Sequence, residues 1–483
     1  MQGRMYDAMV LLLRFIARFF FRRVEVVGAE LIPEAGPVVF VGNHPNSLLD
    51  PMLVLTSCKK RRISFAAKDV LFKNPAFRLI LKAVGAVPIK RRSDHGAVAI
   101  NNDDTFKALH AVLDEGGAFG IFPEGISHFR TELQPLKTGA ARLALEAFER
   151  GLHVAIVPCG LNYRRRTRMR GQVLVQYGAP FFISDDDVQL RLRDALKNAE
   201  EKKEDPNRAQ ARALTEIIDD ALRAETVNAK DFETLRTLDT VRRLYAPPER
   251  RLSLKERSEL HRRFLEHYER LEHLPEVKAL YNDVTLYNFK LDALGLKDED
   301  LRRPLSRLFG LFRISRHLFR MSVMIPFAVP GLIFHFPVFA AAVVAGETLV
   351  SRKDVIATTK LMVGSLTVFL GYGTVMAWLL FTLPFPTSIV WALLAAAALF
   401  LSAAAALSVL EQQHLLRQGM RVLVVLMHLK QEVEWLKEKR KILRGQILAA
   451  VETYVDPGLE RIVRPDPAVL LAGDEVLSSR PQQ

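Results

Sequence analysis

Cysteine is scarce in this sequence. The 483 residues include only Cys58 and Cys159, which are far apart in the chain. A disulfide framework requires several cysteines, and a structural zinc site requires ligands paired a few positions apart. The sequence has neither pattern. We therefore expect a protein of a reducing compartment, with no disulfide framework and no zinc site.

A cleavable signal peptide is not expected either. The apolar run over residues 8–21 is interrupted by Arg14 and Arg18, and no small-residue cleavage site follows it. These arginines are four positions apart and share one helical face, while Leu and Phe occupy the other. The pattern predicts that residues 1–23 form an interfacial amphipathic helix, too short and too charged to span a bilayer. The alternative is a surface helix packed on a domain.

Acidic residues are fewer than basic ones. The sequence has 54 Asp and Glu against 68 Lys and Arg, which gives a formal net charge of +14. This balance fits nucleic acid, an anionic membrane surface or phosphorylated substrates. The arginine clusters lack interleaved stacking aromatics, and no motif for a reading helix is visible. We therefore expect no nucleic-acid partner.

Residues 24–185 alternate short β-branched runs with helical patterns. Strands are predicted at 24–28, 37–43, 63–67, 117–123 and 153–163, and helices at 69–83, 101–115 and 138–150. This alternation predicts an α/β domain, a mixed sheet flanked by helices. Residues 186–318 are charged and helix-favouring, so they predict a separate helical lobe inserted after the α/β domain.

A membrane region is predicted over residues 319–410. Residues 361–383 and 387–410 carry no charged side chain, and each is long enough to cross a hydrocarbon core of about 30 Å. Basic residues precede and follow the pair, which predicts a transmembrane hairpin with both ends in the cytoplasm.

Residues 321–346 are also apolar, but prolines interrupt them at positions 326, 330 and 337. We expect a re-entrant or interfacial segment there. Residues 411–483 predict an amphipathic helix, with Leu429, Val433, Leu436, Leu443 and Ile447 on one face, followed by a disordered tail.

A histidine and a carboxylate follow one of the predicted strands. The apolar run VFVG ends in Asn43-His44, and Asp50 comes six positions after His44. A neutral imidazole can take a proton from a substrate hydroxyl, while a carboxylate holds its other nitrogen and balances its charge. A structural interpretation stays open, because Ser47 and Asp50 have the spacing of a capping box.

Three further polar groups follow strand-like runs. Glu124 and Gly125 follow the run GAFGIFP. They therefore lie at the carboxyl end of a predicted strand, where α/β proteins bind ligands, although an ordinary Pro-Glu-Gly turn would have the same sequence. Lys90 and Arg91 end GAVPIKR and suit an anion such as phosphate, or form a solvated basic edge. A cluster after residue 163 could meet headgroups or phosphates, or be a solvated face: Arg164, Arg165, Arg166, Arg168 and Arg170.

Together these blocks resemble the PlsC-like glycerophospholipid acyltransferases, over residues 24–185. The matching blocks are Asn43-His44 with Asp50, Gly85 to Arg91, Phe122 to Gly125 with Ser127, and Val157-Pro158. The sequence is more similar still to the fungal-type glycerol-3-phosphate and dihydroxyacetone-phosphate acyltransferases. This similarity lies in the helical insertion, the hairpin and the runs NHPNSLLDP, GAVPIKR, LKTGAARLAL and SRKDVIATTK. Five residues separate His44 from Asp50, whereas the wider family has four and the fungal-type branch has the longer spacing.

The resemblance implies a multi-pass membrane O-acyltransferase of phospholipid biosynthesis, with its catalytic domain on the cytoplasmic face of the membrane, the plasma membrane if the source is bacterial. The donor would be acyl-CoA or acyl-carrier protein, the acceptor glycerol 3-phosphate or dihydroxyacetone phosphate, and no metal or other cofactor would be needed. His44 would be the general base and Asp50 would orient it. The acceptor would be positioned by Lys90, Arg91, Glu124, Gly125 and Ser127.

Two other functions stay open. Lysophosphatidate (1-acylglycerol 3-phosphate) also presents a phosphate and a hydroxyl, so the same residues would suit a lysophosphatidate acyltransferase. A non-catalytic membrane protein that binds lipid is the more distant alternative. His44, Asp50 and Glu124 argue against it, because binding alone does not need a general base.

Overall fold

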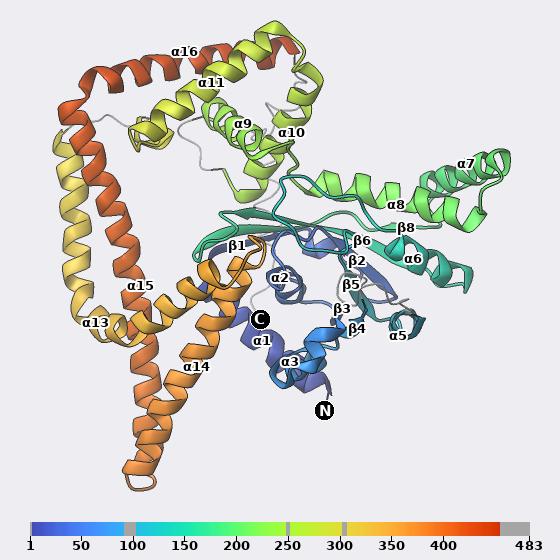
Figure 1. Ribbon diagram of the computed structural model, residues 1–483, viewed down its shortest axis with the longest axis horizontal. Helices are drawn as coiled ribbons and strands as arrows, with labels where there is room; N and C mark the ends of the chain where they lie inside the picture. Colours follow the sequence, from blue (N-terminus) through green and yellow to red (C-terminus); the bar gives the residue numbers. More distant parts are fainter. Residues whose placement is uncertain (1, 91–102, 248–251, 302–306, 455–483) are drawn as a thin grey trace, which may run out of the picture. The chain divides into compact units, whose positions relative to one another are not determined.

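The computed structural model describes residues 2–90, 103–247, 252–301 and 307–454 (Figure 1). The chain forms two compact units. The first unit comprises Met1–Asn228 together with Gly346–Leu361, and the second comprises Ala229–Ala345 and Met362–Gln483. The first unit is therefore discontinuous in sequence.

An eight-stranded mixed sheet forms the centre of the first unit. Its strands are β1 (Phe21–Val27), β2 (Val38–Gly42), β3 (Ile63–Lys68), β4 (Val87–Ile89), β5 (Ala118–Ile121), β6 (Ala155–Arg164), β7 (Gly171–Tyr177) and β8 (Phe181–Phe182). Their order is β1-β7-β6-β2-β5-β3-β4, with β8 paired to β6. The pairs of β6 with β7 and with β8 are antiparallel and the others are parallel. The predicted mixed sheet is confirmed, although the sequence analysis named no strand at β7 or β8.

Helices cover both faces of this sheet. They are α1 (Gln2–Phe20), α2 (Leu49–Ser57), α3 (Pro75–Ala83), α5 (Asp103–Asp114), α6 (Gly139–Glu149), α7 (Asp186–Lys202) and α8 (Pro206–Glu225), with short 3-10 turns at Ala29–Leu31 and Asp69–Lys73. Alternate residues of β2 serve opposite cores, as the two-residue period of a strand requires. Phe40 packs with α1 and α2, and Val39 packs with α5, α6 and α8.

The structure moves one predicted domain boundary. The helical lobe was expected to begin at residue 186, but α7 and α8 belong to the first unit. Leu192, Leu214 and Leu222 are buried in the core that covers the second face of the sheet. Both helices are highly charged overall, but apolar residues with helical spacing form a stripe on one face that packs on the sheet. Overall composition does not reveal such a stripe.

Helix α1 has two kinds of apolar surface. Val10, Ala17 and Phe20 are buried against the first unit, whereas Leu11 and Phe15 are 66% and 52% exposed. The helix is therefore packed on the domain, as the alternative interpretation expected. Its exposed apolar row suits a membrane interface, which stays a prediction.

The second unit is helical throughout its described residues. Its more polar helices are α9 (Phe232–Tyr245), α10 (Leu254–Leu271), α11 (Pro275–Ala293), α12 (Asp298–Leu301) and α16 (Lys430–Tyr454). Four residues of the apolar face predicted for the C-terminal helix are buried: Val433, Leu436, Leu443 and Ile447. The predicted disordered tail at the end of the chain lies outside the described residues, which end at Tyr454.

Three further helices are long and apolar: α13 (Arg307–Thr348), α14 (Ile356–Thr382) and α15 (Thr387–His428). Their segments Ile314–Thr348, Ile356–Thr382 and Thr387–Val422 are long and apolar enough to cross a membrane. The last two correspond to the predicted hairpin. The predicted interruption of the first by prolines is wrong, because all three prolines lie inside one continuous helix. Each proline removes one backbone hydrogen bond, which apolar spanning helices tolerate.

Candidate active site

Two neighbouring parallel strands supply the central loops of the site. β2 ends at Gly42 and leads into Asn43-His44, and β5 ends at Ile121 and leads into the Phe122–Gly125 loop. Because the strands pair in parallel, both loops leave the same edge of the sheet. The Asn43 side chain holds the first loop to β6 through two hydrogen bonds with the backbone of Leu161, of 2.7 and 3.2 Å. The sheet therefore brings together groups that are 80 residues apart in sequence.

His44 and Asp50 form a buried pair. The His44 Nδ1 atom lies 2.8 Å from Asp50 Oδ2, and the two residues are 8% and 0% exposed. The five-residue spacing between them is thus compatible with a direct hydrogen bond. The alternative capping box is not formed, because Leu48 occupies the N-cap of α2 and no side chain caps that helix.

Asp50 is held by two further donors. The backbone N–H of Asn46 donates to Oδ2 at 2.7 Å, and the Tyr163 hydroxyl donates to Oδ1 at 2.6 Å. Burial, followed by the charge of Asp50, raises the pKa of Tyr163 well above its ordinary value. Tyr163 therefore remains a proton donor, and Asp50 remains available to accept the Nδ1–H of His44. This arrangement leaves Nε2 as the nitrogen that can accept a proton.

The imidazole ring is fixed by stacking as well as by hydrogen bonding. The ring of Phe122 stacks on that of His44, with a centroid distance of 4.3 Å and an interplanar angle of 8°. The ring of Phe65, from β3, stacks on the ring of Phe122 in turn, with a centroid distance of 5.5 Å. The aromatic residue that precedes Pro123-Glu124 thus orients the base, which is a role the sequence analysis did not assign.

Glu124 ties the two loops together. It is 3% exposed, and its Oε1 accepts the backbone N–H of His44 at 2.6 Å. Its Oε2 accepts the backbone N–H of Gln134 at 2.8 Å and the Nε2–H of His128. The backbone N–H of His128 in turn donates to the carbonyl of His44 at 3.1 Å. The geometry gives Glu124 a positioning role, whereas its predicted contact with the acceptor stays a prediction.

Gly125 allows a cation to lie close to this loop. Its φ is +76°, a conformation that other residues rarely adopt. A Cβ atom at this position would lie 2.6 Å from Nζ of Lys137, which is exposed. The sequence analysis noted the run LKTGAARLAL but did not single out Lys137. The signal was present, since this lysine lies directly before the predicted helix 138–150.

Arg166 is the arginine of the predicted cluster that lies at the site. Asn46 donates through its side chain to the Arg166 carbonyl at 3.1 Å, and the Arg166 guanidinium interacts with Asp50 and Glu124. Burial lowers the pKa of this guanidinium, and the two carboxylates oppose that effect. The other members of the cluster differ: Arg164, Arg165 and Arg168 are exposed, and Arg170 bonds to backbone carbonyls next to β1.

The remaining predicted site residues lie in two other places. Lys90 follows β4, on the same edge of the sheet as His44, with β3 and β5 between β4 and β2. Arg91 lies outside the described residues. Ser127 is buried, and its hydroxyl donates to Asp354 Oδ2 at 2.6 Å. That carboxylate comes from the segment between α13 and α14, which the sequence analysis did not connect to the site.

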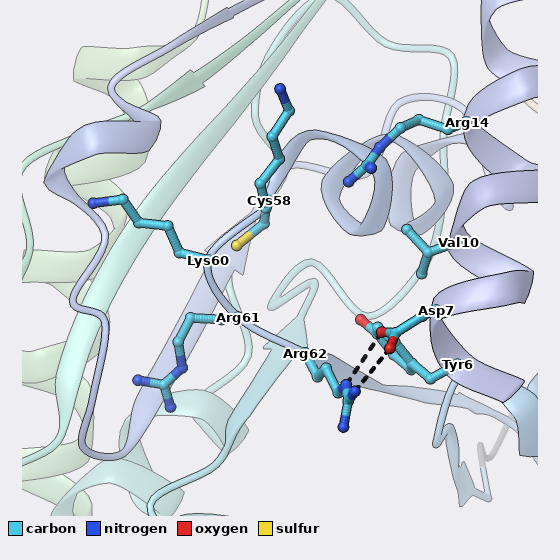
Figure 2. A pocket seen from close by; sticks show the side chains of 9 residues that line it. Tyr6, Asp7, Val10, Arg14, Cys58, Lys60, Arg61 and Arg62 are labelled. Carbon is cyan, nitrogen blue, oxygen red and sulfur yellow. Dashed lines mark hydrogen bonds and ion pairs between the residues drawn. The ribbon is translucent and has the colours of Figure 1, made fainter. Parts of the chain in front are cut away.

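A separate cationic pocket lies between α1 and the turn before β3 (Figure 2). Its volume is about 420 Å³, and it is lined by Tyr6, Asp7, Val10, Arg14, Cys58, Lys59, Lys60, Arg61 and Arg62. Arg62 pairs with Asp7 at 2.9 Å, and Arg14 donates to the carbonyl of Thr56 at 2.9 Å. Figure 2 shows Lys60 and Arg61 pointing away from α1. These guanidinium groups already have protein partners, and none of the lining residues belongs to the His44 site.

Neither cysteine is placed to act as a nucleophile. Burial raises the pKa of Cys58 and, more strongly, that of Cys159, so both remain neutral thiols. Across the four described ranges of the chain, no group of three or more His, Cys, Asp and Glu side chains is arranged to hold a metal ion.

Two protein-family models match the chain. Residues 23–162 match the model described as Acyltransferase, and residues 237–459 match the Glycerol-3-phosphate acyltransferase 2 C-terminal domain. The first match contains both loops of the His44 site. The predicted resemblance to the acyltransferases, and within them to the fungal-type branch, is confirmed.

Curated relatives agree with these matches. An uncharacterized acyltransferase of Schizosaccharomyces pombe is 26% identical over 74% of this chain and 66% of its own length. Glycerol-3-phosphate O-acyltransferase 2 of Saccharomyces cerevisiae is 26% identical over 74% of this chain and 63% of its own length. A 1-acyl-sn-glycerol-3-phosphate acyltransferase of Borreliella burgdorferi is 28% identical over 44% of this chain and 73% of its own length. The chain thus spans less than two thirds of the length of the two yeast relatives.

Proposed function

Because the chain combines an acyltransferase domain with a glycerol-3-phosphate acyltransferase 2 C-terminal domain, we propose that it is a membrane-bound O-acyltransferase of phospholipid biosynthesis. It transfers a fatty acyl group from acyl-CoA or acyl-carrier protein to glycerol 3-phosphate or dihydroxyacetone phosphate. The observation that carries this proposal is the buried His44–Asp50 pair, whose Nδ1–Oδ2 distance is 2.8 Å and which leaves Nε2 as a base. No metal or other cofactor takes part in the proposed reaction.

The proposed reaction proceeds by direct attack. His44 Nε2 takes the proton of the acceptor hydroxyl, and the resulting oxyanion attacks the thioester carbonyl carbon. The carbon–sulfur bond breaks, and the imidazolium returns its proton to the departing thiolate. Asp50 stabilises the imidazolium in between, while Tyr163 and the Asn46 amide hold Asp50 in place. No covalent acyl-enzyme is needed.

Several cations support a phosphate-bearing acceptor. Lys137 lies against Gly125, and Arg166 lies near Asp50 and Glu124. Lys90 follows β4 at the same edge of the sheet, and we assign it to the proposed phosphate site together with Arg91, the next residue in the sequence. Ammonium and guanidinium groups bind phosphate oxygens through charge-assisted hydrogen bonds. We assign to Gly125 the role of leaving room for the Lys137 ammonium group, because a Cβ atom at position 125 would lie 2.6 Å from Nζ.

The choice of acceptor depends on the C-terminal half of the chain. Lysophosphatidate is the second candidate, since the Borreliella burgdorferi relative acts on a 1-acylated acceptor according to its name. That similarity covers 44% of this chain, whereas the similarity to the yeast glycerol-3-phosphate enzyme covers 74%, and residues 237–459 separately match the glycerol-3-phosphate acyltransferase 2 C-terminal domain. This difference in coverage favours glycerol phosphate. A purely lipid-binding role would not need the hydrogen-bonded His44–Asp50–Tyr163 chain.

The proposed location is a membrane, with the acyltransferase domain on the cytoplasmic face. Basic residues flank the uncharged runs of α14 and α15, as cytoplasmic ends require. The acylated product partitions into lipid, so an enzyme anchored by apolar helices releases it where it is used.

The test is thiol release from palmitoyl-CoA by the purified full chain in detergent. Glycerol 3-phosphate, dihydroxyacetone phosphate and lysophosphatidate are offered separately, with H44A as the control. Release that depends on glycerol 3-phosphate or dihydroxyacetone phosphate and is lost in H44A supports the proposal. Release with lysophosphatidate alone keeps the mechanism and changes the acceptor. If no acceptor drives release, the assay is repeated with palmitoyl-acyl-carrier protein, and a second failure overturns the enzymatic reading.

A further inference from the structure

The segment Gly346–Leu361 joins α13 to α14, yet it belongs to the first unit. Ala357 is 0% exposed and lies in the core cluster that includes Phe40, and Leu361 packs against the same cluster. The acyltransferase domain thus includes residues 349–355, which lie between two candidate membrane spans, together with the adjoining ends of both spans. The remaining question is what this segment contributes to the site.

Asp354 is the central polar residue of the segment. It is 4% exposed, and its Oδ2 accepts the Ser127 hydroxyl at 2.6 Å and the Arg352 Nη2–H at 2.8 Å. Arg352 Nε lies 3.3 Å from Asp354 Oδ1, so the guanidinium pairs with both carboxylate oxygens. Nη2 of Arg352 also donates to the Ser127 carbonyl at 2.6 Å. Ser127 is therefore held at both its hydroxyl and its backbone.

A second contact reaches the other loop of the site. The Thr358 hydroxyl donates to the carbonyl of Asn46 at 3.2 Å, and the N–H of Asn46 donates to Asp50. Ser127 is followed by His128, which bonds to the backbone of His44 and to Glu124. The segment thus contacts both loops that fix the base. It bonds to Asn46, which itself bonds to Asp50, and to Ser127, which precedes His128.

We propose that Asp354 is a positioning residue for His44, and that Arg352, Asp354 and Thr358 form a brace that holds the two site loops in register. The brace acts through Ser127 and Asn46 and does not contact the reacting atoms. Its role in acyl transfer rests on the proposed function. The proposal makes the rate of that reaction depend on residues placed between two apolar helices.

The physical argument is one of geometry. A general base must lie within hydrogen-bond distance of the proton that it removes, and a displacement of about 1 Å can lower the rate by roughly 100-fold. The backbone of His44 bonds to Glu124 and His128, and the loop that carries His44 is held by Asn43 and Asn46. Removal of Asp354 leaves the Ser127 hydroxyl and Arg352 without their shared carboxylate, so the loop over residues 124–128 loses one of its anchors.

The experiment compares D354A and D354N with E347Q in the full chain. Glu347 is a matched control because it forms an ion pair with Lys360 at 3.0 Å in the same segment and bonds to neither site loop in the structure described for that segment. We expect D354A to lower kcat by about 10- to 100-fold, D354N to lower it less, and both to leave KM for palmitoyl-CoA within about twofold. E347Q should retain the wild-type values.

A double mutant separates positioning from an independent role. If Asp354 acts through Ser127, the S127A/D354A protein loses no more activity than the more impaired single mutant, because the two residues form one interaction. Single effects that multiply in the double mutant would overturn the proposal. A D354A protein with kcat within twofold of wild type would overturn it as well.

Hydrogen exchange provides a readout that does not require activity. In D354A we expect faster exchange of the Asn46, His128 and Gln134 amides, which are bonded to the site in the wild-type protein. Unchanged exchange at these amides contradicts the brace whether or not the chain transfers acyl groups. If wild type shows no transfer but D354A shows faster exchange, the proposed function fails and the brace stands. If D354A does not fold, T358V serves in its place and should show faster exchange at Asn46.

Discussion

Each unit of the protein holds a histidine near an aspartate, buried in the first unit and partly exposed in the second, and the two sets differ in what the histidine can do. In the first unit, His44 bonds to Asp50 through Nδ1 and follows a parallel strand. In the second unit, Asp239 pairs with Arg242, with a closest distance of 2.6 Å, and His261 bonds through Nε2 to the Leu235 carbonyl at 3.0 Å.

The difference lies in the partners of each aspartate. Asp50 accepts hydrogen bonds from the uncharged donors of Asn46 and Tyr163 and bonds directly to the imidazole, so it can stabilise an imidazolium. The charge of Arg166 also interacts with Asp50, but no arginine separates this carboxylate from the histidine ring. The charge of Asp239 is balanced by Arg242 and Arg243, and burial lowers the pKa of His261 to about 4. Burial and charge therefore do not identify a catalytic histidine on their own. What distinguishes the two sets is that His44, after the end of a strand, bonds directly to a carboxylate, whereas His261 bonds to a backbone carbonyl.

The largest expected effect is that of H44A. Loss of the base should lower the rate of thiol release by at least about 10², the lower end for one general base. H261A is the matched control, and its kcat should stay within about twofold of wild type where the protein is folded. An H44A protein with near-wild-type turnover would show that the two histidines do not differ in the way proposed.

A smaller effect is expected for Y163F. The substitution removes one hydrogen bond to Asp50, and a hydrogen bond to a charged group contributes about 1.5–3 kcal/mol. We therefore expect kcat to fall by roughly 10-fold, with little change in KM for either substrate. Steady-state kinetics with both substrates varied would check this. A pure increase in KM would assign Tyr163 to substrate binding.

K137A should change binding more than turnover. If Lys137 contacts the acceptor phosphate equally in the ground state and the transition state, its loss raises the acceptor KM and leaves kcat nearly unchanged. We expect an increase of about 10-fold. R91A should act in the same direction. An unchanged KM for the acceptor in either variant would remove that residue from the phosphate site.

Substitution of His261 is expected to have the smallest effect on the reaction. It should instead change how the free energy of unfolding depends on pH. The folded pKa of His261, about 4, lies below its ordinary value of about 6.5, so the unfolded chain binds the proton more readily. Stability is therefore complete above about pH 6.5 and falls by roughly 1–3 kcal/mol as the pH drops toward 4. Thermal unfolding in detergent from pH 7 to 4 would measure this, and H261Q should flatten the dependence. An unaltered pH dependence in H261Q would assign the acid sensitivity to other groups.

The parts of the site that the sequence predicted are those with a local signal. His44 and Glu124 each follow an apolar run, and neighbouring parallel strands place such strand ends on one edge. Lys137 lies directly before a predicted helix, but its closeness to Gly125, where a Cβ atom would lie 2.6 Å from its Nζ, is a contact of the folded loop that sequence patterns do not reveal. The Ser127–Asp354 contact was missed because its partners are 227 residues apart. No periodicity extends over that separation.

The fold shows the same division. Alternating strands and helices predicted the mixed sheet, whereas β7 was missed although it pairs with both β1 and β6. The boundary at residue 186 was placed too early, because composition separates charged from apolar segments and does not report which helices pack on a sheet. The prolines at positions 326, 330 and 337 predicted an interrupted, re-entrant or interfacial segment, whereas one continuous apolar helix of 42 residues accommodates them.

The discontinuity of the first unit also fixes an order of events during synthesis. Domains fold as the chain emerges, with the N-terminal part first. Residues up to Asn228 can form the sheet early, but Arg352, Asp354 and Ala357 follow the whole of α13. The last contacts of the acyltransferase domain therefore form only after the ribosome has made the first long apolar helix. A nascent chain that ends before Arg352 lacks the proposed brace of the His44 loop, so completion of the site follows synthesis of the first helix that is long and apolar enough to cross a membrane.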